Sequence, residues 1–197
     1  MCIRDRYSRE ENTRLFHQMA QKAVDTDPEN PDAMSSLSMS YSIKKDLNKR
    51  LETAEKALEL NPSHPRSNFS YGQALTNFGR NEEALSYVKK AIELDPQSKR
   101  NYEGFFPLLY IALKDWENAI TWLNTAHERS PHSRYFGWKA AVYGKMNDLD
   151  SAKENLNSFL KERPEIKTLE DYEKVAPTII KDTCLLYTSP SPRDLST

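Results

Sequence analysis

The sequence Ala57-Leu58-Glu59-Leu60-Asn61-Pro62 returns 34 residues later as Ala91-Ile92-Glu93-Leu94-Asp95-Pro96. Prolines keep the same spacing along the chain, with gaps of 34, 34, 35 and 33 residues between Pro28, Pro62, Pro96, Pro131 and Pro164. Each proline separates two runs with helical apolar periodicity, because proline cannot continue a helix. A period near 34 residues is typical of an array of helix-turn-helix repeats.

The apolar periodicity between these prolines predicts ten helices. Their expected ranges are 9–25, 31–44, 47–60, 65–78, 81–94, 99–113, 116–129, 133–146, 149–162 and 168–181. Turns between repeats carry Asx-Pro or Ser-Pro steps, and Asp and Asn there favour helix ends and caps. Helices of about fourteen residues are marginal alone in water, so they must pack on their neighbours.

The best-formed repeat spans residues 65–98, with Tyr71 and Gly72 in its first expected helix and Ala84 in its second. This pattern resembles the tetratricopeptide repeat, in which small residues let the paired helices approach closely. The resemblance covers roughly residues 9–166. It implies an all-α, right-handed α-solenoid of about four and a half repeats plus a C-terminal helix. Such arrays hold a partner on a concave surface and rarely catalyse reactions.

Two repeats depart from the family pattern. The repeat at 31–64 has Ser38 where glycine is expected and Arg50 where a small residue is expected. We expect Arg50 to extend its head group to water. The next-but-one repeat has Pro107 at the glycine-like place, which should kink or delay that helix.

Composition disfavours several classes of function. The chain has 28 Lys and Arg against 29 Asp and Glu, with both signs interspersed, which disfavours nucleic-acid binding. The longest apolar run, residues 105–113, is too short to span a membrane. Neither a glycine-rich phosphate loop nor a nucleophile elbow is present. We therefore expect no enzyme activity, no cofactor and no metal, and a cytoplasmic location.

Both ends of the sequence look foreign to the repeat. Residues 1–6 and 184–197 resemble translated sequencing-adapter sequence, and they hold both cysteines, Cys2 and Cys184. We expect a fragment of a longer bacterial protein from metagenomic sequence. The expected layout is adapter-like sequence at 1–6, a repeat array at 7–166, a capping helix at 167–183 and adapter-like sequence at 184–197.

The four histidines have no metal-ligand spacing, and we expect capping or surface roles for His17, His64, His127 and His132. Ten of the twenty aromatic residues lie between Tyr102 and Tyr143, including all three tryptophans. This cluster predicts core packing between helices, with a hydrophobic binding pocket as the alternative.

In the tetratricopeptide repeat family the first helix of each repeat lines the concave groove. The inward phase places Thr76, Ala112 and Ala141 there, together with the candidate peptide-binding residues Phe69, Gln73, Asn77, Asn101, Leu108, Ile111, Arg134 and Lys145. Some family members hold a C-terminal carboxylate with a clamp of Lys, Asn and Arg on these helices. That clamp is missing here, where the inward places hold Ser35, Met39, Ser70, Asn101 and Phe105.

The resemblance implies a scaffold or regulatory module that binds a protein or peptide of unknown identity. Two alternatives stay open. Residues 11–16, 147–152 and 163–172 also resemble the repeat region that follows the catalytic domain of some bacterial class III adenylate/guanylate cyclases, which would make the chain a regulatory tail. The second alternative is a self-association module.

Overall fold

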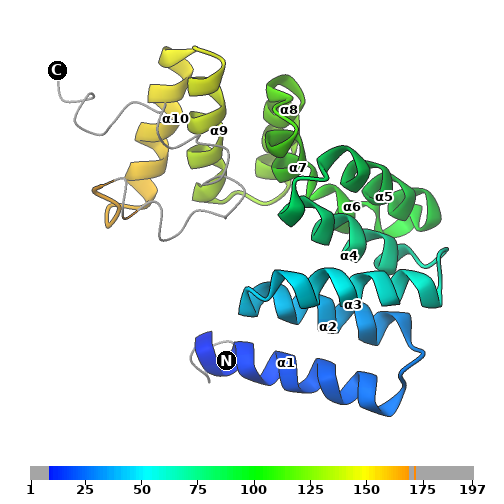
Figure 1. The fold of residues 1–197 in the computed structure, drawn as a ribbon. Helices are drawn as coiled ribbons and strands as arrows, with labels where there is room; N and C mark the ends of the chain where they lie inside the picture. The colour runs from blue at the N-terminus through cyan, green and yellow to red at the C-terminus, as the bar shows by residue number, and fades with distance from the viewer. Residues whose placement is uncertain (1–8, 169–170, 172–197) are drawn as a thin grey trace. The chain divides into compact units, whose positions relative to one another are not determined.

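The computed structural model describes residues 9–168 and 171, and its ordered elements there are all helices (Figure 1). The chain divides into two compact units, Met1–Tyr102 and Glu103–Thr197, and each is described by itself. The segments expected to be adapter-like, and all but two residues of the expected helix at 168–181, lie outside the described residues.

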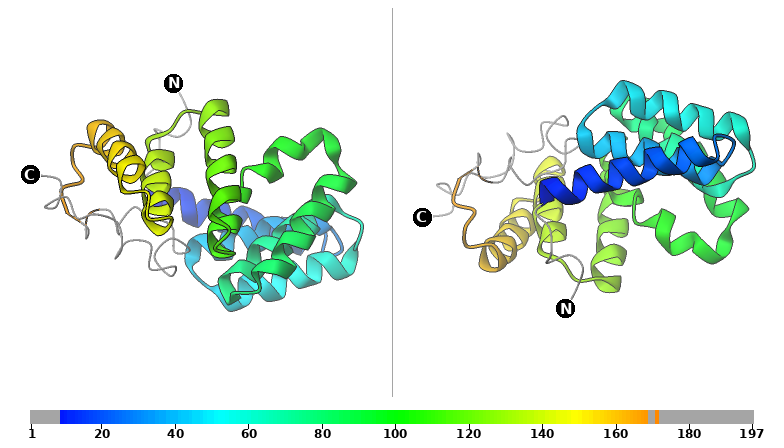
Figure 2. Two further views of the ribbon diagram at one scale, coloured as in Figure 1. Left: turned by 90° about the horizontal axis from the view of Figure 1, so that it is seen from above. Right: turned by 90° about the horizontal axis from the view of Figure 1, so that it is seen from below.

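The first unit contains five α-helices and two short 3-10 helices among its described residues. They are α1 (Arg9–Thr26), α2 (Pro31–Lys44), α3 (Leu47–Leu60), α4 (Pro65–Leu75), η2 (Thr76–Phe78), α5 (Asn81–Leu94) and η3 (Pro96–Ser98). Helix α2 packs against α3, and α4 packs against α5, so each pair forms one repeat (Figures 1 and 2). Helix α1 packs against α2 as the second helix of a preceding repeat.

The boundary between the units falls within α6 (Lys99–Glu103). The second unit continues with α7 (Phe106–Ala112), α8 (Trp116–Arg129), α9 (Ser133–Lys145) and α10 (Leu149–Glu162). Helix α7 pairs with α8, and α9 with α10. The predicted helix at 99–113 is broken at Pro107, as expected. Pro107 lies in the first turn of α7. Proline is tolerated there because the backbone N–H groups of the first turn make no hydrogen bond within the helix.

Side-chain caps fix where several helices begin. Asn30 caps α2, its Oδ1 accepting from the backbone N–H groups of Asp32 at 3.0 Å and Ala33 at 3.1 Å. Asp46, Asp115 and Asp148 cap the second helices of three repeats in the same way. These caps satisfy N–H groups that lack a partner within the helix.

The turn inside each repeat uses one left-handed residue. Lys45, Gly79, Lys114 and Asn147 have φ values of 61°, 72°, 59° and 60° and occupy the same repeat position. This conformation reverses the chain between the paired helices, and only glycine adopts it without steric cost.

The paired helices approach each other closely near the middle of each repeat. A Cβ added to Gly72 would lie 3.0 Å from the Ala84 carbonyl oxygen and 3.1 Å from a Val88 methyl carbon. In the preceding repeat the Ser38 hydroxyl donates to the Arg50 carbonyl oxygen at 2.8 Å, which is the equivalent backbone contact. Ala84 and Ala119 have no exposed surface, as close contact between the paired helices requires.

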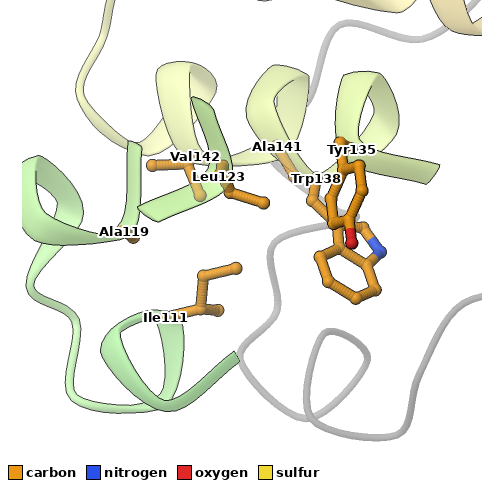
Figure 3. Packing of buried hydrophobic residues seen from close by; sticks show 7 residues of the cluster. All are labelled: Ile111, Ala119, Leu123, Tyr135, Trp138, Ala141 and Val142. Atoms are coloured by element: carbon orange, nitrogen blue, oxygen red, sulfur yellow. The ribbon is translucent and has the colours of Figure 1, made fainter. Parts of the chain in front are cut away.

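The aromatic residues of the second unit contribute mainly to its core. Its buried cluster joins α7, α8 and α9 and consists of Ile111, Ala119, Leu123, Tyr135, Trp138, Ala141 and Val142 (Figure 3). Tyr135 and Trp138 meet edge to face with ring centroids 5.8 Å apart. Trp116 packs against the cluster from its edge, so the predicted core role holds for these residues.

The left-handed turn position generates a stability prediction. Lys45→Gly and Lys114→Gly should each stabilise the fold by about 0.5–1 kcal/mol, because the relief of backbone strain exceeds the entropy that glycine adds to the unfolded chain. Urea denaturation followed by circular dichroism measures this change. Lys44→Gly, one residue earlier in the helix, is the control and should destabilise by about 1 kcal/mol. Equal losses of stability in Lys44→Gly and Lys45→Gly would contradict the left-handed backbone conformation of Lys45.

Candidate functional site

Two parallel stripes of side chains mark the first helices of the first unit. Residues 32, 36, 39 and 43 lie along one face of α2. Residues 66, 69 and 73 on α4 and residue 77 on η2 form the second set, in which 66, 73 and 77 follow 32, 39 and 43 by 34 positions. Spacings of three and four residues place each set on one side of its helix. Because α2 and α4 are in contact, we call these stripes together the α2–α4 surface.

Polar contacts join the two stripes at the N-terminal ends of the helices. Arg66 Nη2 donates to the Ser36 hydroxyl at 3.1 Å, and Arg66 Nη1 lies 3.7 Å from an Asp32 carboxylate oxygen. His64 Nε2 lies 3.5 Å from the other Asp32 oxygen. The charges at this end of the surface are therefore paired within the protein.

The middle of the α2–α4 surface is apolar on its α2 side. Met39 and Ile43 are 40% and 50% exposed, and they lie one helical turn apart. On α4, Phe69 and Gln73 are half-buried, and the Phe69 ring centroid lies 5.0 Å from that of Tyr102. Exposed apolar side chains therefore lie beside an amide on the same surface.

Arg50 reaches the C-terminal end of this surface from α3. Its Nη1 donates to the Asn77 side-chain oxygen at 2.6 Å, while its Nε is buried without a hydrogen-bond partner. The expectation that Arg50 extends its head group to water is met only in part, because the residue is half-buried and its Nη1 is held by Asn77. One guanidinium nitrogen, Nε, is taken out of water without a hydrogen-bond partner.

Burial lowers the pKa of Arg50 from its ordinary value to about 10. The group stays charged at neutral pH, so its burial there costs free energy. Since the folded pKa is the lower one, the folded chain binds fewer protons than the unfolded chain between these two values. The stability contribution of Arg50 therefore rises with pH through that window and is unfavourable below it.

The candidate binding residues divide between the two units. Phe69, Gln73 and Asn77 share the α2–α4 surface, and Asn101 is exposed on α6 in the same unit. Thr76 is only 7% exposed, so its predicted inward place is wrong. Its hydroxyl instead donates to the Gln73 carbonyl oxygen at 2.8 Å, within the helix.

The second unit corrects part of the predicted set. Ile111 and Ala141 are buried in the core cluster at 0% and 2% exposure and cannot line a surface, because side chains of α7, α8 and α9 pack together there. Leu108 packs on the same cluster as a half-buried residue. Exposed Arg134 lies with its guanidinium 5.0 Å from the Tyr135 ring centroid, and Lys145 and Ala112 are half-buried.

Two of the histidines cap helices, as expected. His64 accepts from the Ser67 backbone N–H at the start of α4, and His132 accepts from the Arg134 N–H at the start of α9. In the part of the chain that the structure describes, no group of three His, Cys, Asp or Glu is placed to hold a metal ion. No described helix combines the length and apolar character needed to cross a membrane.

Comparison with known proteins agrees with the repeat geometry. Family models described as tetratricopeptide repeat match residues 31–64 and 51–99. Residues 31–99 of the chain therefore carry tetratricopeptide repeats. No curated protein sequence matches it. The repeats support a protein–protein interaction module, and the family's arrays typically act as scaffolds without catalysis.

Solved tetratricopeptide repeat structures share the fold. A thermophilic repeat protein of Thermus thermophilus, TTC0263, is 20% identical with a TM-score of 0.61, covering 80% of this chain and 86% of its own. PilW, a type IV pilus biogenesis factor, is 18% identical with a TM-score of 0.68 over 95% and 83% of the two chains. YrrB is 18% identical with a TM-score of 0.58, and the match covers 79% of this chain and 80% of the YrrB chain.

Sequence reasoning placed Met39 inward but left it out of the candidate binding residues, and it missed Ile43 and Arg50. Ile43 is the equivalent of Asn77 one repeat earlier, so the period alone could have found it. Arg50 could have been found from its place in the repeat. The equivalent positions 84, 119 and 152 in the other three repeats are alanine, so a charged residue at position 50 is an exception.

The cost of burying Arg50 generates a second prediction. Arg50→Met keeps the length of the side chain but removes the unpaired charge, and it should raise the free energy of unfolding by about 1–3 kcal/mol. Urea denaturation at neutral pH measures the change. The matched control is Arg80→Met, which removes an exposed arginine paired with Glu83 at 2.7 Å and should change stability by less than about 1 kcal/mol. A loss of stability in Arg50→Met would mean that the Asn77 bond outweighs the burial cost.

Proposed function

We propose that the α2–α4 surface binds a peptide segment of a partner protein, with Met39 and Ile43 as its apolar contacts. The observation that carries this proposal is their exposure, 40% and 50%, beside half-buried Phe69 and Gln73 on the neighbouring helix. Apolar groups next to each other favour binding because covering them removes apolar area from water.

The polar members of the surface suit an extended or helical peptide. Gln73 carries a side-chain amide that both donates and accepts hydrogen bonds, and a bound backbone needs both kinds of partner. YrrB, which shares the fold, is described as a tetratricopeptide repeat protein with an unusual peptide-binding site. This supports peptide binding by the fold and identifies no partner for this chain.

Selection of peptides from a random display library on the full chain tests the proposal. Binding of the selected peptides, measured by fluorescence anisotropy, should fall about tenfold or more in Met39→Glu/Ile43→Glu, because buried charges replace the apolar contacts. Both side chains are exposed, so helicity by circular dichroism should stay unchanged.

The matched control is Leu60→Glu/Leu94→Glu. These leucines are exposed to a similar extent, 40% and 38%, but they end the second helices α3 and α5. Peptide affinity should be unchanged in this control. Recovery of no binding peptide, or equal losses in both double variants, would overturn the assignment of the α2–α4 surface.

A further inference from the structure

One face of α1 is exposed where the equivalent helices of later repeats are covered. Ala23 is exposed, whereas its equivalents in the next two repeats, Ala57 and Ala91, have no exposed surface. Met19, one helical turn away, is 67% exposed, and its equivalent Thr53 is only 8% exposed. Since each comparison is between residues at one repeat position, the difference lies in what surrounds α1.

In later repeats the same face packs against the first helix of the repeat. Tyr87 of α5, the equivalent of Met19, meets Tyr71 of α4 edge to face with ring centroids 4.8 Å apart. Trp122 of α8, at the same position of the next repeat, packs on Phe106 of α7 with ring centroids 4.6 Å apart. Helix α1 packs against α2, and among the described residues no helix precedes α1 along the chain (Figure 1). Its open face is therefore the face that receives a helix in the other repeats.

The open face of α1 has the residue spacing of a helix that pairs with another helix. Its members follow one another after four, three and four residues, and they are Asn12, Phe16, Met19 and Ala23. This alternation is that of a heptad pattern, and it keeps all four side chains on one side of the helix. We call these four residues the α1 stripe.

The α1 stripe complements itself when two α1 helices run antiparallel. With the two-fold axis midway between Phe16 and Met19, each of these side chains faces the other one in the second copy. Exposed Glu11 and Lys22 are eleven residues apart, about three helical turns, so both lie along the same edge of the stripe. In the antiparallel pair Glu11 is offset from Lys22 of the second copy by about 3 Å along the axis, which these long side chains span. The two-fold axis repeats this pairing of opposite charges at both ends of the stripe.

We propose that the chain forms a homodimer in which the α1 stripes of two copies pack antiparallel and Glu11 pairs with Lys22 of the second copy. Helix α1 has 18 residues and is about 27 Å long. A single pair of such helices is smaller than a standard protein interface, so we expect a dissociation constant of about 10–100 µM. The dimer uses no residue of the α2–α4 surface, and its test is therefore independent of peptide binding.

Sedimentation equilibrium of the full chain tests the proposal, with a reductant to keep Cys2 and Cys184 from linking copies. We expect a monomer–dimer equilibrium that Met19→Glu weakens about tenfold or more, because the new charge faces Phe16 of the second copy. The matched control is Leu149→Glu at the start of α10, where the leucine is 56% exposed, and it should leave the dimer unchanged. A chain that stays monomeric at about ten times the expected dissociation constant, or equal weakening by both variants, would overturn the homodimer.

An exchange of charges tests the antiparallel arrangement. Lys22→Glu brings like charges together at both ends of the stripe and should weaken the dimer about three- to tenfold. Glu11→Lys/Lys22→Glu restores opposite charges and should recover the affinity of the unmodified chain. Such a recovery is specific to the interface, because a lysine near the start of α1 is unfavourable for the helix itself. A double variant as weak as Lys22→Glu would overturn the antiparallel pairing.

Discussion

The close approach of the two helices within each repeat is the constraint on which the rest of the structure depends. The backbone of α4 lies so near α5 that a Cβ on Gly72 would meet the Ala84 carbonyl oxygen at 3.0 Å. Ser38 makes the same approach in the preceding repeat and converts it into a 2.8 Å hydrogen bond to the Arg50 carbonyl. Such contacts bury one side of each short helix, and short helices have little stability of their own.

This constraint also explains the unusual place of Arg50. Ser38 occupies the contact between α2 and α3, and the Arg50 side chain extends from α3 to Asn77. The repeat thereby acquires a half-buried cation at the edge of its first-helix surface.

The repeat period was enough to predict the helices, the turns and the break at Pro107, because each follows from local residue chemistry. The repeat period did not predict which neighbouring helix each side chain packs against. The side-chain bond of Arg50 depends on Asn77, 27 residues away, and Ile111 belongs to the core because residues of α8 and α9 pack on it. The origin of the chain ends and the identity of flanking domains stay predictions because they concern parts beyond the described residues, and self-association stays a prediction as well.

The unfolding free energy of variants at Ser38 tests the close approach most directly. Ser38→Ala removes the hydroxyl bond, whereas Ser38→Val also adds a methyl group where no space remains. The same pair at Ser36, on the exposed face of α2, corrects for helix propensity. We predict that Val is less stable than Ala at position 38 by about 1–3 kcal/mol beyond the difference at position 36. Equal differences at the two positions would contradict close contact between the paired helices.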